Sequence, residues 1–348
     1  MQSGIAGNSY NPVHDSIVDM KRNAPMSIMA MCVVGILISS AVVVINADAF
    51  VSEAGQTLYV GGTGPGNYTS IQEAVDAAAE GDIVYVYNGT YMETVRIPQS
   101  ITLTGEDENG TVIDGNITGT VLEIAADSVT VKHVTIAGGG GDAGWDVPAV
   151  NITADHVVLQ QCIIRDNEHT GISLVSASHC TVSYNVIVNT SYTGIRVGEA
   201  SISTVISYNQ ITGGISGIYA YASGNQTISY NNVANCSKGI YLEESRGNLL
   251  LGNHLTGNQE GIFLSYAPGN TIQFNNFISN IRHARFVKLL RLGFLAPNMW
   301  SRNYWDDWMD VGGKVIFGAI YVPTFTLIGA FIPWIGVDWH PTAEPYDW

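Results

Sequence analysis

Charged residues are scarce in this sequence. They make up only 13% of its 348 residues, against roughly 25% in typical globular domains. Glycine is abundant instead, with 38 residues. This composition argues against a helical bundle and favours a β protein with many turns.

Basic residues and cysteines are rarer still. Because 14 Lys and Arg stand against 30 Asp and Glu, we expect no nucleic-acid partner, since a phosphate backbone needs clustered bases. One of the four cysteines lies in an apolar N-terminal run, and Cys162, Cys180 and Cys236 take dissimilar positions in the repeat described below. Their spacing predicts buried thiols and neither a disulfide framework nor a metal cluster.

The N-terminal segment predicts export. Residues 26–45 form an uncharged apolar run, preceded by Lys21 and Arg22 and followed by the small residues Ala47 and Ala49. We therefore expect a cytoplasmic n-region at 1–25 and a signal peptide or membrane anchor at 26–49. Both alternatives stay open, because about 20 apolar residues can also span a bilayer. In either case the body after residue 50 lies outside the cytoplasm, at the cell surface or free, with membrane contact through 26–45 if the anchor is kept.

The body repeats Gly-Ile at a period of about 22 residues. An apolar residue follows each Ile two positions later, as in a strand with one buried face, and the pattern extends upstream to Val150/Ile152 and Leu122/Ile124. Identical residue types at one phase must stack on each other, which a parallel β-helix achieves coil by coil. The glycines of this repeat are Gly171, Gly194, Gly217, Gly239 and Gly261.

Asparagines recur at the same period, and we interpret them as structural. Asn tolerates a tight corner, and its side-chain amide can bond from coil to coil. We expect His133 and Gln161 to hold this phase upstream, and a second corner to contain Asn225, Asn248 and Asn270. The main ladder is Asn185, Asn209, Asn231, Asn253 and Asn275.

The ends of the coil stack need covers. Residues 68–82 predict an amphipathic helix over the first coil, with Ser70 and Glu73 as a capping box and Ile71, Val75 and Ala78 on one face. The uncharged run 315–337 contains prolines and glycines and predicts an apolar cap, packed by most of the C-terminal tryptophans; a membrane-contacting segment is the competing interpretation. The expected division is a β-helix with its N-terminal cap at 50–281 and a cap region at 282–348.

Three segments add a family resemblance. The segment "TSIQEAVDAAAEGDIVYVYNGTY" before Gly-Ile and Asn coils, "NYWDDW" at 303–308 and "DWHP" with "EPYD" at 338–347 resemble NosD-type, pectin-lyase-like β-helix proteins, more narrowly their archaeal exported members. The resemblance covers about residues 57–348. It implies an all-β, right-handed parallel β-helix, but β-helices host lyases, hydrolases, adhesins and scaffolds alike.

One edge of the coils is the first candidate site. The step from Leu122 to Val150 has extra residues in a Gly-rich insertion at 137–148, which stacking brings near two following turns. Three interpretations stay open: a hydrated turn edge, a glycan-binding site, or a polysaccharide lyase or hydrolase with Arg165 or Arg196 as base and carboxylates for Ca²⁺. The residues brought together are Asp142, Trp145, Asp146, Arg165, Asp166, Glu168, His169 and Tyr192.

An outward file is the second candidate. Ser173, Arg196, Tyr219, Tyr241 and Phe263 share one phase between the buried positions. The three aromatic residues form either a carbohydrate platform or a cross-coil stack that stiffens the sheet.

The family label "copper-binding" finds no support in the sequence, because the histidines of the body share no phase outside the Asn ladder and lie beside no Cys or Met cluster. We predict no metal or other cofactor. The sequence therefore favours an exported surface β-helix that binds a glycan or envelope component, or serves as a structural module there. The alternatives are a polysaccharide lyase or hydrolase at the edge cluster around Trp145 and Glu168, and an accessory for envelope metalloprotein assembly.

Overall fold

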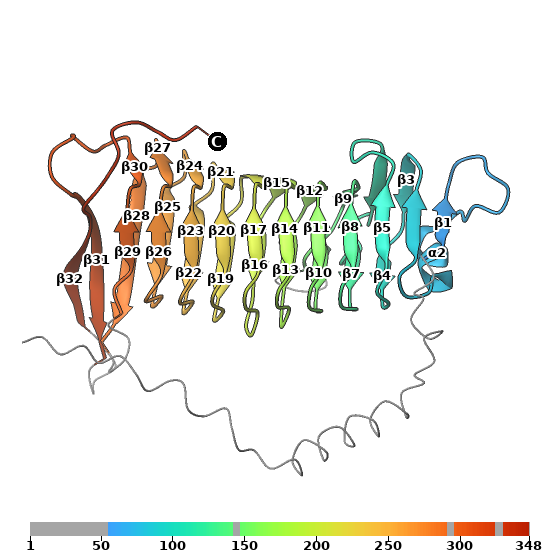
Figure 1. The fold of residues 1–348 in the computed structure, drawn as a ribbon, viewed down its shortest axis with the longest axis horizontal. Helices are drawn as coiled ribbons and strands as arrows, with labels where there is room; N and C mark the ends of the chain where they lie inside the picture. Colours follow the sequence, from blue (N-terminus) through green and yellow to red (C-terminus); the bar gives the residue numbers. More distant parts are fainter. Residues whose placement is uncertain (1–54, 142–146, 291–295, 324–329, 348) are drawn as a thin grey trace, which may run out of the picture. The chain divides into compact units, whose positions relative to one another are not determined.

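The protein folds into a right-handed parallel β-helix of about ten coils, with one short helix. The computed structural model describes residues 55–141, 147–290, 296–323 and 330–347. Residues from Ala54 to the C-terminus form one compact unit. Figure 1 shows its coils side by side from helix α2 to the hairpin β31–β32. The fold class expected from the sequence is confirmed.

Each coil contributes up to three short strands, and strands of successive coils pair in parallel. The first column pairs β4 Val95–Ile97, β7 Leu122–Ile124, β10 Val150–Ile152, β13 Ile172–Leu174, β16 Thr193–Val197, β19 Ser216–Tyr221, β22 Lys238–Glu243, β25 Glu260–Ser265, β28 Arg282–Leu289 and β31 Lys314–Val322. The second pairs β1 Thr57–Val60, β2 Ile83–Val86, β5 Thr102–Gly105, β8 Thr130–Lys132, β11 Val158–Gln160, β14 Thr181–Ser183, β17 Val205–Ser207, β20 Thr227–Ser229, β23 Leu249–Leu251, β26 Thr271–Gln273, β29 Met299–Ser301 and β32 Ala330–Asp338.

The third column is a separate sheet of ten strands. Pairing of β31 with β32 joins the first two columns into a single 22-stranded sheet. The third column pairs β3 Gly89–Met92, β6 Thr111–Asp114, β9 Thr135–Ala137, β12 Ile163–Asn167, β15 Val186–Thr190, β18 Gln210–Thr212, β21 Asn232–Ala234, β24 His254–Thr256, β27 Asn276–Ile278 and β30 Tyr304–Trp305.

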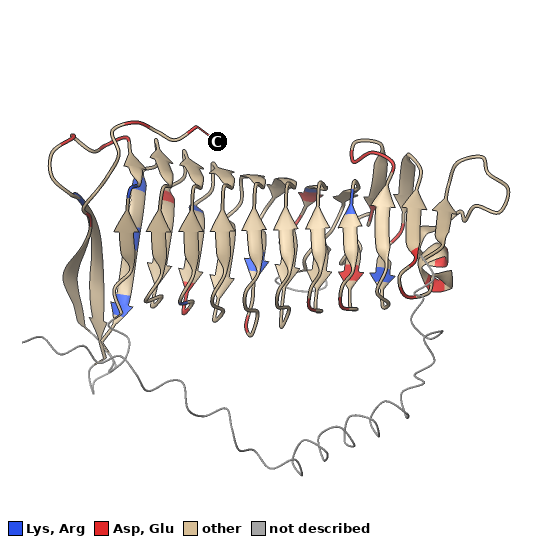
Figure 2. Ribbon diagram, viewed as in Figure 1, with Lys and Arg blue, Asp and Glu red and all other residues tan. Residues whose placement is uncertain are grey.

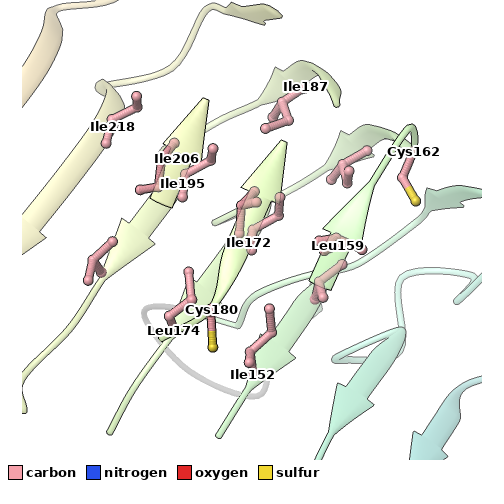
Figure 3. Packing of buried hydrophobic residues seen from close by; sticks show 14 of the residues in the cluster. Ile152, Leu159, Cys162, Ile172, Leu174, Cys180, Ile187, Ile195, Ile206 and Ile218 are labelled. Atoms are coloured by element: carbon pink, nitrogen blue, oxygen red, sulfur yellow. The ribbon is translucent and has the colours of Figure 1, made fainter. Parts of the chain in front are cut away.

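The interior consists of apolar files parallel to the coil axis. Ile195 pairs with Ile218, and Ile240 with Ile262, and each of these side chains is fully buried. Figure 3 shows this packing, with Ile172, Ile195 and Ile218 following one another through successive coils. No single coil can bury its own inner face, so the stack as a whole supplies the core. Cys162, Cys180 and Cys236 are buried free thiols, as predicted.

The main asparagine ladder is confirmed. The Asn209 side chain is fully buried, accepts from the backbone N and Nδ2 of Asn185 at 3.0 Å, and donates to Asn231 Oδ1 at 2.9 Å. The same pattern continues to Asn303. The upstream assignment was wrong by one residue, because Cys162 N donates to Asn185 Oδ1 and so Cys162, not Gln161, holds the ladder phase.

The second ladder also needs a correction, and a third was missed. Gln226 N donates to Asn248 Oδ1 at 2.9 Å, so Gln226 occupies the place expected for Asn225. The ladder then runs through Asn270 to Asn298. A third ladder starts at Cys236, whose N donates to Asn258, and continues to Asn280.

Helix α2 (Ile71–Ala77) covers the N-terminal end, as predicted. Ser70 is its N-cap, and its side chain accepts a hydrogen bond from Glu73 N. The carboxylate that the expected capping box would take from Glu73 comes from another residue. The Glu93 carboxylate accepts from Ser70 Oγ at 2.8 Å and from Ile71 N at 2.8 Å. The buried face contains Ile71, Ala74 and Val75, while Ala78 is only partly buried.

The C-terminal run forms a β-hairpin that packs on the last coil. Strands β31 and β32 are antiparallel over nine residue pairs, and β31 continues the first column beyond β28. Trp300 and Trp305 are buried and Trp308 packs against the core, as predicted for most of these tryptophans, whereas Trp334 is 50% and Trp339 71% exposed. Among the described residues, we find no helix long and apolar enough to cross a bilayer. The run 26–45 lies outside the described residues.

Candidate functional site

The Gly-rich insertion between β9 and β10 lies against Glu168. Glu168 Oε2 accepts from Gly141 N at 2.9 Å. At Gly140, which has φ +142°, an added Cβ would lie 2.7 Å from the Glu168 Cβ, so only glycine fits this approach. The predicted partners Asp142, Trp145 and Asp146 lie outside the described residues, and their place beside Glu168 stays a prediction.

The remaining edge residues are engaged with one another. Arg165 forms an ion pair with its neighbour Asp166, whose other oxygen accepts from Asn189 Nδ2 at 3.1 Å. The hydrogen bond from Asn189 and then the pair with Arg165 hold the pKa of Asp166 below its usual value. Tyr192, 44% exposed, bonds through its backbone N to His169 O at 3.2 Å.

The two candidate bases are not neighbours. Arg165 lies on β12 of the ten-stranded sheet, whereas Arg196 lies on β16 of the larger sheet. Arg196 instead pairs in register with Ser173 and Tyr219, which confirms the predicted outward file.

The aromatic residues of that file are stacked face to face. Tyr219 and Tyr241 have ring centroids 4.9 Å apart at 15°, and Tyr241 and Phe263 5.0 Å apart at 4°. Arg285 belongs to β28 of the next coil, and its guanidinium lies 3.8 Å from the centroid of the Phe263 ring. Stacked rings cover one another's faces and present mainly their edges to solvent, so this geometry supports the stiffening interpretation. A ligand-binding role for the three rings stays a prediction.

Acidic and basic side chains surround this file. Tyr219 Oη donates to Glu243 Oε2 at 2.6 Å, and the Lys238 ammonium lies 4.2 Å from the Tyr241 centroid. Burial first, and then Glu243, raise the pKa of Tyr219 and of Tyr241, so both hydroxyls stay protonated at neutral pH.

A second aromatic ladder was missed in the sequence. Tyr184, Tyr208 and Tyr230 stack at 4.9 and 5.1 Å. All three have positive φ, and each directly precedes a residue of the Asn ladder. The signal was visible as Tyr-Asn pairs at 184–185, 208–209 and 230–231.

A large cleft lies where the turns after the first column meet the hairpin. It has a volume of about 970 Å³ and is lined by turns of four successive coils together with residues of β28 and β31. This size is within the range of small-molecule sites, roughly 300–1,000 Å³. Its polar and aromatic lining residues are Asn225, Glu244, Arg246, Tyr266 and Tyr321.

The two tyrosines of this cleft are arranged differently from the ladders. Tyr266 and Tyr321 meet edge to face, with centroids 6.3 Å apart at 63°. Burial, and then Tyr321, raise the pKa of Tyr266, which keeps its hydroxyl a donor. Glu244 and Arg246 are exposed at the rim and add one charge of each sign. The cleft therefore offers apolar ring surface beside hydrogen-bonding groups.

The fold defines a pectin-lyase-like right-handed parallel β-helix protein. The family model described as "Periplasmic copper-binding protein (NosD)" matches residues 75–308, about two thirds of the chain. The chain therefore belongs to the NosD family, which is consistent with export.

Similarity to individual proteins is more limited. Two Arabidopsis thaliana proteins match. "Probable pectinesterase/pectinesterase inhibitor 12" is 26% identical over 131 residues, which cover 33% of this chain and 24% of that protein. "Probable pectinesterase 56" is 28% identical over 129 residues, which cover 32% of this chain and 45% of that protein. The chain thus spans less than half the length of these relatives.

Solved structures share the fold alone. A complex of XylC with xylose has a TM-score of 0.58 at 13% identity, with 71% of this chain and 69% of that chain covered. The GH136 lacto-N-biosidase from Eubacterium ramulus has a TM-score of 0.52 at 15% identity, with 72% and 63% covered.

The donors present do not fit copper. Within the described ranges, the ligand atoms of three or more His, Cys, Asp or Glu residues converge in one place, at His283, Asp306 and Asp307. His283 Nε2 lies 2.8 Å from Asp306 Oδ1 and 3.2 Å from Asp307 Oδ1, and the Lys314 ammonium contacts Asp307. Three of the four groups at this cluster, the two carboxylates and the ammonium, are not of the His, Met and Cys type that copper favours.

The expectation that the histidines share no phase was wrong, because His156 and His179 stack with centroids 5.2 Å apart. Burial raises the pKa of Cys162 and of Cys236 to about 12, which keeps them as thiols, whereas a metal ligand is a thiolate. The role as an accessory for metalloprotein assembly stays a prediction.

Proposed function

We propose that this protein is an exported, non-catalytic β-helix module that binds carbohydrate of the cell envelope or its surroundings. The observation that carries the proposal is the 970 Å³ cleft with Asn225, Glu244, Arg246, Tyr266 and Tyr321 in its wall. A sugar presents one apolar face and a rim of hydroxyls, and an aromatic ring beside amide, carboxylate and guanidinium groups matches both.

The cleft suits a sugar better than the ladders do. In the Tyr219 file and the Tyr184 ladder, ring faces are covered by the next ring. The edge-to-face pair Tyr266–Tyr321 leaves ring surface toward the cleft. Both matched Arabidopsis thaliana relatives are named as probable pectinesterases, which supports a carbohydrate ligand for this chain.

Binding of a carbohydrate without cleavage is better supported than a lyase or hydrolase activity. Arg165, the candidate lyase base within the edge cluster, already pairs with Asp166, and a general base must be available to accept a proton. The other candidate base, Arg196, lies on a different sheet from that cluster. The edge cluster remains the site at which the lyase hypothesis, with Ca²⁺ as a ligand of its carboxylates, can be tested.

One experiment separates these functions. The purified protein is incubated with acidic and neutral polysaccharides, with and without Ca²⁺, and both binding and new unsaturated ends are measured. We expect binding that Tyr266→Ala weakens at least tenfold and that Tyr208→Ala, an exposed tyrosine outside the cleft, leaves unchanged. Binding lost on Tyr192→Ala but not on Tyr266→Ala would move the site to the insertion edge. Unsaturated ends that disappear in Glu168→Ala would contradict the non-catalytic proposal.

A further inference from the structure

The hairpin β31–β32 exposes apolar side chains on both of its faces. Within β31, Ile316 and Ile320 are buried against the end of the coils. Along β32, six successive residues from Ala330 to Ile335 are exposed. The large exposed side chains of the two strands are Val315, Phe317, Phe331, Ile332, Trp334 and Ile335.

The strand register distributes these side chains over two surfaces. Phe317 pairs with Ile335, and Tyr321 with Phe331, on one face; Ile320 pairs with Ile332 on the other. Alternate residues of a strand point to opposite faces, so Phe331 and Ile332 must point in opposite directions. A continuous exposed apolar surface of this kind marks an interaction site. On the second face the coils already bury Ile316 and Ile320, so a partner has to cover the first face and the exposed Ile332 and Trp334 of β32.

The free edge of β32 is poorly suited to another strand. Pro333 lies in the middle of β32 and has no backbone N–H to donate. Proline on an edge strand is a usual obstacle to strand addition. Edge-to-edge pairing with a second copy of this chain is therefore disfavoured, and the two apolar faces remain to be covered.

Charge separates the hairpin from the coils. Residues 315–337 carry no charge, and residues 282–348 contain six basic and six acidic residues. Residues 55–281 contain 20 acidic and six basic residues. Figure 2 shows the two hairpin strands free of charged positions between Lys314 and Asp338, while acidic positions are spread over the coils. An anionic membrane surface repels the coils but not the C-terminal end.

The geometry points to a lipid bilayer as the partner: we propose that the hairpin β31–β32 inserts into the interfacial region of a membrane. A lipid phase covers both faces of a ribbon at once, which a protein groove does not. Phe331, Ile332 and Ile335 would enter the acyl boundary, and Trp334 and Trp339 are of the type enriched where headgroups meet hydrocarbon. The docking does not depend on whether residues 26–45 are retained, and it adjoins the carbohydrate cleft, because Tyr321 of the cleft contacts Phe331 with ring centroids 5.1 Å apart.

Site-specific labelling of the full chain tests this docking. Cys32 is replaced by Ser, and Cys162, Cys180 and Cys236 are buried and stay unlabelled. An environment-sensitive fluorophore is placed through Phe331→Cys or Ile332→Cys, one on each face. Tyr208→Cys, an exposed position on the coils, is the matched control because this label shares the chain and the vesicles with the hairpin labels.

The protein is reconstituted with vesicles of phosphatidylcholine alone or mixed with phosphatidylglycerol. We expect labels at 331 and 332 to shift to the blue, to be quenched by lipid-borne quenchers, and to be several-fold less accessible to iodide than the label at 208. Iodide quenching at 331 and 332 equal to that at 208 would overturn the proposal. A blue shift without lipid that rises with protein concentration would overturn it in favour of a second copy.

Discussion

Asp338 ends the main asparagine ladder by taking the place of the next asparagine. Its Oδ2 accepts from Asn303 N at 3.0 Å and from Asn303 Nδ2 at 2.9 Å, the same two donors that each ladder Asn offers to its successor. Oδ2 also accepts from Trp305 Nε1 at 3.2 Å. The carboxylate is fully buried. The two C-terminal motifs, around 303–308 and 338–347, thus meet to close the last coil.

Removing this carboxylate should destabilise the C-terminal coils. Asp338→Ala leaves buried donors of Asn303 and Trp305 without an acceptor, at a cost of about 3 kcal/mol. Asp338→Asn keeps one acceptor oxygen and should cost about 1 kcal/mol. Tryptophan fluorescence during urea unfolding reports this region because Trp305 bonds to Asp338. Asp347→Ala, at an exposed position, is the control; equal midpoints for D338A and D347A would refute the ladder-ending role.

The interior of the ladder should be equally sensitive. Asn231 accepts from Asn209 and donates to Ile206 O at 2.8 Å and Asn253 Oδ1 at 3.0 Å, all buried. Asn231→Ala should lower the free energy of unfolding by about 3 kcal/mol, because it leaves several buried groups unpaired. Its exposed neighbour supplies the comparison: Asn232→Ala should change stability by less than about 0.5 kcal/mol. Similar losses in both variants would mean that the ladder contributes nothing special.

Stability should fall on mild acidification. Burial lowers the pKa of His254 below 6.5, and burial, opposed by Asp307 and Asp306, lowers that of His283. A depressed histidine pKa means that the folded state binds the proton less well than the unfolded chain. The contribution of such a histidine to the free energy of unfolding is therefore full above pH 6.5 and is lost as the pH falls below that value.

The variant His254→Asn isolates part of this effect. Position 254 pairs with Asn232 and Asn276, so asparagine continues the file. The melting temperature of the variant should decline less between pH 7 and pH 5 than that of the wild type. A steeper decline in the variant would reverse the assigned sign.

Much of the fold was readable from the sequence because stacking places identical residue types at one phase. The Gly-Ile pairs predicted the strands of the first column, and the ladder asparagines predicted the position of the corner. The errors of one position at Gln161 and Asn225 arose because a polar type alone does not reveal which residue donates to the next coil. Cys162 donates through its backbone N, and any residue except proline has this donor, so the side-chain type gives no signal.

The candidate site was less readable. The cleft brings turns of four coils against β31, and no local sequence pattern predicts this contact between distant segments. The run 315–337 has no alternation of polar and apolar residues, so its period could not distinguish a strand from another buried segment. Pairing with β28 decides its conformation, which is a tertiary effect.

Coil-on-coil register is tested most directly by engineered disulfides. Gln210 and Asn232 are exposed partners on β18 and β21. Neighbouring strands lie about 4.8 Å apart, within the roughly 4.4–6.8 Å that a disulfide spans between Cα atoms. Peptide mass spectrometry should find the cross-link in Gln210→Cys/Asn232→Cys. It should be absent in Gln210→Cys/Ala234→Cys, which is two residues out of register; the reverse result would contradict the stacked coil.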